Sequence, residues 1–110
     1  MINLLVDEAY AFDYLSILQV KKNNNCKNNY DQVCEHLQLQ VPNIDQILAS
    51  QEYQNMIKAN QITFQLVDDV RYNKQDVTAK QVDDANMFRY QCKCELQSKF
   101  FKNKVTESKT

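Results

Sequence analysis

The pattern of apolar and polar residues predicts four helical segments. Their approximate bounds are Asn3 to Lys21, Tyr30 to Gln40, Ile44 to Asn73 with a kink near Ser50, and Val77 to Phe101. Three polar breaks separate them: the Asn-rich run Lys21–Asn29, Pro42, and Tyr72–Asp76. Pro42 is a clear boundary because the residue before a proline resists helical geometry.

The third segment needs a test, since its stretch QITFQLV alternates like a strand. At about 100° per residue, Met56, Phe64 and Val67 share one helical face, and only Ile62 is badly placed. The helical pattern covers the longer window. We therefore predict an all-α fold, a bundle of about four largely antiparallel helices. The alternative is an α+β fold with short strands near residues 37–41 and 62–67.

Composition supports the helical interpretation. The 110 residues include no Gly and one Pro, whereas tight hairpins need the positive φ that Gly supplies most easily. We expect a single helical domain over residues 1–101 and a polar, frayed tail over 102–110. The abundance of Asn and Lys is typical of a low-GC genome, such as that of an AT-rich bacterium or a phage.

Charge and hydropathy limit the classes of partner that the protein is expected to bind. The net charge of −1 argues against a broad phosphate-binding surface, so nucleic acid is not an expected partner. No apolar run approaches the roughly 20 residues that span a bilayer. The N-terminus lacks the basic region and the small-residue cleavage site of a secretory signal. We therefore expect a cytoplasmic protein that does not contact a membrane.

The first predicted helix carries an unusual group of acids and aromatic rings. On a helical wheel Asp7 falls within the apolar face, beside Tyr10 and Tyr14, while Glu8 and Asp13 fall on the opposite, solvated side. We therefore predict that Asp7 is more buried than Glu8 or Asp13. A helix N-terminus, a tyrosine hydroxyl or a lysine would satisfy such a carboxylate, which is costly to bury unpaired.

A metal site is the functional alternative for Asp7. Carboxylates inside helical bundles bind divalent cations, so Asp7 could share Mg²⁺ or another divalent cation with one member each of the pairs Asp68–Asp69 and Asp83–Asp84. Such a centre would suit a phosphate-ester or nucleotide hydrolase. The structural interpretation of these five residues is favoured, because helix ends and solvated faces explain them without a cofactor.

Cysteine and histidine chemistry gives weaker signals. Without a secretory signal the four cysteines should be reduced thiols, with Cys92 in the core, Cys34 partly buried and Cys26 in an exposed loop. Cys92 and Cys94 are two apart and diverge on a helix, so they cannot share one zinc ion. His36 directly follows Glu35, whereas bundle metal sites space these residue types three apart.

The leading functional hypothesis is a non-enzymatic interaction or structural protein that uses no cofactor. It would bind a protein partner or associate with itself. The last predicted helix is apolar on two sides, which requires two packing neighbours. Its first stripe contains Ala85, Phe88, Cys92, Leu96 and Phe100, and its second stripe contains Met87, Tyr90, Cys94 and Phe101. A further candidate contact face on the first helix contains Leu5, Ala9 and Phe12.

Overall fold

The computed structural model describes residues 5–71 and 78–101, and helices account for all regular structure within these ranges. The helices are α1 (Glu8–Asn23), α2 (Tyr30–Gln40), α3 (Ile44–Leu48), α4 (Gln51–Arg71) and α5 (Ala79–Phe101). The all-α prediction is confirmed. The α+β alternative is wrong, because residues 37–40 and 62–67 are helical. The predicted break at residues 72–76 and the tail at residues 102–110 lie outside the described ranges.

The third predicted segment is two helices, so the described ranges contain five helices in place of the four predicted. The Ser50 side chain separates them: its Oγ donates to the carbonyl oxygen of Ile47 at 2.6 Å and accepts from the backbone N–H of Tyr53 at 3.1 Å. This is an N-cap, in which a hydroxyl satisfies a free amide in the first turn of the new helix. The kink expected near Ser50 is therefore a complete break.

The start of α5 has a reciprocal capping box. The Gln81 backbone N–H donates to Thr78 Oγ1 at 3.2 Å, and the Thr78 backbone N–H donates to Gln81 Oε1 at 2.8 Å. Each side chain thus satisfies a backbone donor that the first helical turn leaves without a partner. The sequence stretch TAKQ specifies where α5 begins.

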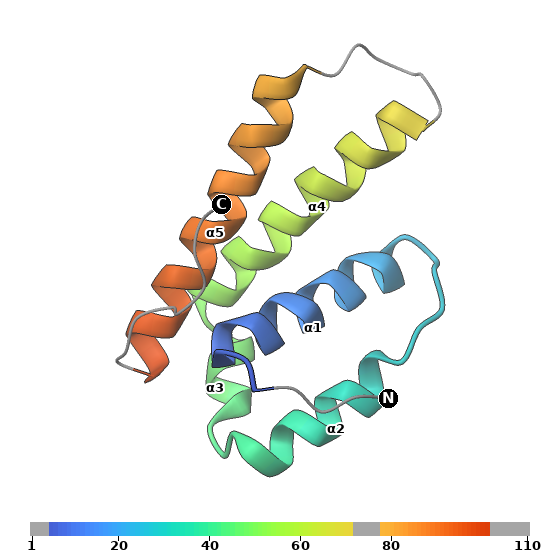
Figure 1. Cartoon of the computed structure of the whole chain (residues 1–110). Coiled ribbons are helices and arrows are strands. Elements are labelled where there is room, and N and C mark those ends of the chain that lie inside the picture. The colour runs from blue at the N-terminus through green and yellow to red at the C-terminus, as the bar shows by residue number, and fades with distance from the viewer. Residues whose placement is uncertain (1–4, 72–77, 102–110) are drawn as a thin grey trace.

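The arrangement centres on a long antiparallel pair, α4 and α5 (Figure 1). Helix α1 packs against both of them, α2 packs against α1, and the short α3 contacts α4 (Figure 1). Phe12 of α1 lies in the centre of the core, with its ring 6.3 Å from those of Tyr53 and Phe101. No helix in the described part of the chain is long and apolar enough to cross a membrane.

Helix α1 buries a different face from the one predicted. Asp13 is 5% exposed and the side chains of Ala9 and Phe12 are buried, whereas Tyr10 and Tyr14 are 38% and 49% exposed. The predicted solvation of Asp13 is wrong, and so is the prediction that Asp7 is more buried than Asp13, since Asp7 is only half-buried. Apolar residues occur on every side of α1, so either of two faces of the helical wheel could be taken as the buried one. Tyr10 and Tyr14 tolerate the solvent-exposed face because the tyrosine hydroxyl is polar. The proposed contact face of Ala9 and Phe12 is the core itself.

Candidate functional site

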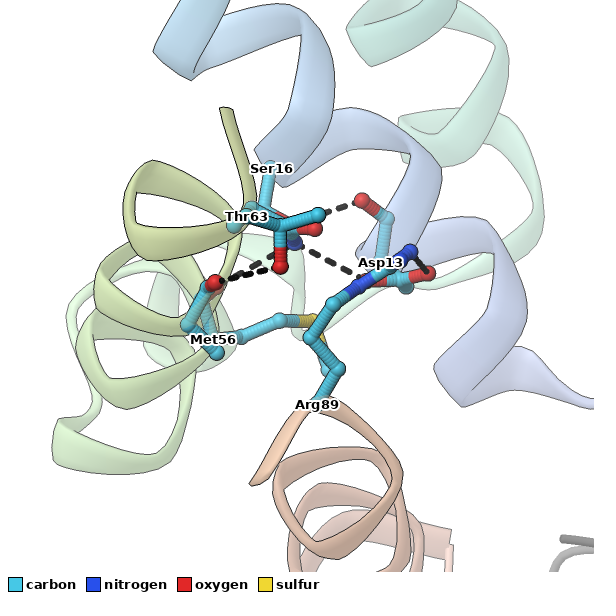
Figure 2. Close-up of polar contacts among 7 residues, drawn as sticks. Asp13, Ser16, Met56, Thr63 and Arg89 are labelled. Atoms are coloured by element: carbon cyan, nitrogen blue, oxygen red, sulfur yellow. Dashed lines mark hydrogen bonds and ion pairs between the residues drawn. The ribbon is translucent and has the colours of Figure 1, made fainter. Parts of the chain in front are cut away.

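A buried group of polar side chains joins α1, α4 and α5. We call it the polar cluster: Asp13, Ser16, Asn60 and Arg89 (Figure 2). Asn60 Nδ2 donates to Asp13 Oδ1 at 2.9 Å and to Ser16 Oγ at 2.6 Å. Arg89 reaches across from α5, and its Nη2 lies 3.2 Å from Asp13 Oδ2. Both oxygens of the buried carboxylate therefore have a partner.

The polar cluster is built by helical spacing. Ser16 lies one turn after Asp13, and its Oγ donates to the Asp13 carbonyl oxygen at 2.7 Å. Asn60 also donates to the Met56 carbonyl oxygen one turn earlier, at 3.2 Å. These bonds within each helix hold the side chains of Ser16 and Asn60 in the orientation in which they contact each other across the helix interface. The cluster thus sets how α1 sits on the α4–α5 pair, since buried polar groups must be paired in one arrangement.

A cleft of about 670 Å³ opens beside the polar cluster, between α1 and α4. We call it the α1–α4 cleft. Its lining residues are Ile17, Val20, Lys21, Cys26, Lys27, Asn60, Thr63, Phe64, Val67, Asp68 and Arg89. Figure 2 shows Thr63 and Arg89 beside Asp13 and Ser16, and both Thr63 and Arg89 also line the cleft. The cleft therefore borders the buried ion pair directly.

The lining combines apolar and cationic side chains. Four apolar residues form one part of it: Ile17, Val20, Phe64 and Val67. Three cations, Lys21, Lys27 and Arg89, accompany a single acid, Asp68. Lys21 and Lys27 are exposed and form no ion pair within the described part of the chain. The cleft is therefore locally positive in a chain whose net charge is −1.

Three of the five candidate carboxylates lie on α1 and α4. Asp7 is the N-cap residue of α1, although its side chain makes no capping hydrogen bond there. Asp68 lines the α1–α4 cleft. Asp69 is buried at 4% exposure, and its Oδ1 accepts a hydrogen bond from Gln65 Nε2 at 3.0 Å.

The other two candidates lie at the start of α5. Asp83 and Asp84 are exposed, and Asp84 Oδ2 pairs with Lys80 Nζ at 3.1 Å, one helical turn earlier. Across residues 5–71 and 78–101, no group of three or more His, Cys, Asp or Glu side chains is placed to hold a metal ion. The structure therefore does not gather the five carboxylates into a metal centre.

The cysteines occupy the predicted environments. Cys92 is buried in the core, Cys34 is half-buried and Cys26 is exposed at the edge of the cleft. Burial raises the pKa of the Cys92 thiol to about 11, and burial also raises the pKa of Cys34. Both groups are therefore held in the thiol form at neutral pH, whereas the thiolate is the nucleophile and the metal ligand.

Comparison of the chain with protein-family models, with curated proteins and with solved structures gives no significant match. The interpretation of the candidate site therefore relies on the geometry of the site alone.

Sequence reasoning missed most of this site. Asn60 could have been found, because on the helical wheel it falls between Val67 and Phe64, on the face predicted to be buried. A polar residue on such a face predicts a hydrogen-bonding partner on the neighbouring helix. The partner Asp13 was assigned to the wrong face, and nothing in the sequence singles out Arg89.

Proposed function

We propose that the protein acts without catalysis, as an interaction protein that binds its partner or ligand in the α1–α4 cleft. One observation carries the proposal: the cleft combines solvent-accessible apolar surface with two lysines that form no ion pair within the described part of the chain. Val67 is 52% exposed, and Lys21 and Lys27 belong to the same lining. Concave sites with an apolar lining and a few polar groups are typical of ligand recognition.

The reactive side chains of the core support the same interpretation. Asp13 is held by Asn60 and Arg89, so its carboxylate already has structural partners. The raised pKa of Cys92 keeps that thiol protonated and weakly nucleophilic. The carboxylate of Asp13 and the thiol of Cys92 are therefore engaged in the core, while the accessible lysines and apolar side chains of the cleft are suited to recognition.

A fragment-binding experiment tests this function. We expect a mixture of small apolar and amphipathic fragments, added to the isotopically labelled protein, to shift NMR signals of Ile17, Val20, Phe64 and Val67 before those of other residues. Such clustering follows from the size and lining of the cleft. Signals that shift instead on another surface, or nowhere, would overturn the proposal.

Two substitutions on α4 provide a matched comparison. Val67→Asp places a charge in the lining, whereas Ile62→Asp places the same charge at a position outside it. Both positions are partly exposed, at 52% and 39%, so neither substitution buries an unpaired carboxylate. We expect Val67→Asp to abolish the fragment shifts and Ile62→Asp to leave them unchanged. Equal loss in both variants would contradict the assignment of the cleft as the binding surface.

A further inference from the structure

We infer that the ligand of the α1–α4 cleft is an amphipathic organic anion, with one carboxylate or similar acidic head and an apolar body. This inference rests on the proposed function and names the class of ligand. The cleft volume of about 670 Å³ falls within the roughly 300–1,000 Å³ of small-molecule sites. A compact organic molecule therefore fits it.

The negative head is argued from charge. Three cations line the cleft, Lys21, Lys27 and Arg89. Asp68 is the single acid of the lining and Asp13 already pairs with Arg89, so one added negative charge balances the group. Lys21 and Lys27 have no ion-pair partner in the described part of the chain. A carboxylate would form charge-assisted hydrogen bonds with them, which are stronger than neutral ones.

Arg89 supplies a second argument for a negative head. Its Nη2 donates to Asp13, while the side chain is 24% exposed and lines the cleft. A guanidinium has five N–H donors, so those that face the cleft can donate to an anionic head. Because Asp68 also lines the cleft, a single negative charge fits better than two.

The apolar body is argued from the remaining lining. Val67 is half-exposed and Phe64 is partly buried, and both lie in the cleft with Ile17 and Val20. An inorganic anion would leave this surface in water. An aliphatic or aromatic body would cover it, and covering apolar surface is favourable in proportion to its area. The two halves of the lining thus match the two halves of one amphipathic ligand.

Three probes with the same chain and different heads test the inference: octanoate, 1-octanol and octylammonium. Each is titrated into the labelled protein while the cleft signals are followed. We expect octanoate to bind at least about tenfold more tightly than 1-octanol, as expected for hydrogen bonds to a charged group. Octylammonium should bind most weakly, and added salt should weaken octanoate alone.

A pair of double variants measures the contribution of Lys21 and Lys27 to octanoate binding. Lys21→Gln/Lys27→Gln removes two charges from the cleft, and Lys58→Gln/Lys80→Gln removes two exposed charges from residues outside its lining. We expect the first variant to reduce octanoate affinity about fivefold to tenfold, because two charge-assisted contacts are lost, without changing 1-octanol binding. The second variant should match the unaltered protein in both titrations.

The outcomes separate the two proposals. If 1-octanol and octanoate bind the cleft equally, or if both double variants weaken octanoate to the same extent, the anionic head is refuted while the cleft remains a binding surface. If octylammonium binds best, the inference is also refuted. If none of the three probes shifts the cleft signals and the fragment mixture also fails there, the proposed function is refuted as well.

Discussion

The carboxylate of Asp13 is buried among α1, α4 and α5. The residue is 5% exposed, and its two oxygens are covered by Asn60 and Arg89. Burying a charge is expensive, and the gain from pairing it depends on good geometry and on further hydrogen bonds. The polar cluster supplies those bonds. Its contribution is therefore best measured by removing one partner at a time.

Removing Arg89 should cost more stability than neutralising Asp13. Arg89→Met leaves a carboxylate, whose side chain is 6% exposed, with Asn60 as its remaining side-chain partner, and we expect a loss of about 3 kcal/mol. Asp13→Asn keeps an oxygen that accepts from Asn60, and it leaves Arg89 free to turn toward solvent from its 24% exposed position. We expect that variant to lose about 1 kcal/mol. Urea unfolding followed by circular dichroism measures both values.

The order of these two losses is decisive. Similar losses, or a larger one for Asp13→Asn, would show that the carboxylate does not depend on the guanidinium. Because Arg89 also lines the α1–α4 cleft, the stability measurement must precede any binding measurement on its variants.

Single residues also show how far the sequence can be interpreted. The cysteine environments were predicted correctly, because Cys92 lies on a clear apolar stripe and Cys26 in a polar run. Asp13 was placed wrongly, because a buried acid is recognised by its partners, and Asn60 and Arg89 are distant in sequence. Pairing across 47 and 76 residues leaves no local pattern.

Individual helices begin where side chains satisfy their first free amides. Ser50 performs this role for α4, through the 3.1 Å contact from the Tyr53 N–H. Asn43 stands at the equivalent position of α3, but its side chain makes no capping hydrogen bond. The two positions therefore allow an N-cap residue that makes a side-chain hydrogen bond to be compared with one that makes none.

Ser50→Ala should cost about 1 kcal/mol, because the Tyr53 N–H loses its side-chain acceptor at the start of a long helix that packs against both α1 and α5. Asn43→Ala should cost less, since no side-chain capping bond is lost there. The two losses are compared in chemical denaturation, with amide hydrogen exchange at Tyr53 as a local probe. Faster exchange at Tyr53 in the Asn43 variant than in the Ser50 variant would contradict this assignment.

Helices were predicted more reliably than their phases and caps. The periodicity of α4 and α5 extends over many residues, so their helical state was predicted from sequence. Asn43 and Gln46 match the sequence pattern of a capping box, but the Asn43 side chain makes no capping bond, whereas Thr78 and Gln81 form a capping box that was not predicted. A cap depends on how the preceding chain approaches the helix, and composition alone does not specify this approach.

The molecule as a whole is closed by contacts between its first and last helices. The Ala9 backbone N–H donates to Gln97 Oε1 at 2.8 Å, and Gln97 Nε2 donates to Glu8 Oε1 at 2.8 Å. Gln97 is fully buried, and Phe101 packs against Phe12 one turn further along. The amide of one side chain thus fastens the start of α1 to the end of α5. The cleft lies toward the other end of α1, where the helix approaches Asn24.

Gln97→Ala should cost about 2 kcal/mol, because the buried Ala9 N–H loses its side-chain acceptor at the start of α1 and a buried side chain is removed. Gln91→Ala is the matched control, since Gln91 is exposed on the same helix, and its loss should stay within about 0.5 kcal/mol. Thermal and urea unfolding measure both changes. Equal losses of stability in the two variants would show that the hydrogen bonds of Gln97 to Ala9 and Glu8 do not stabilise the contact between α1 and α5.

The closure also has a consequence for the time at which the protein can fold. Eighty-eight residues separate Ala9 from Gln97, so a ribosome adding about 5–20 residues per second needs roughly 4–18 s to synthesise the interval. During that time Phe12 lacks Phe101, one of the two aromatic rings that pack against it. The core can therefore be completed only after α5 has been synthesised.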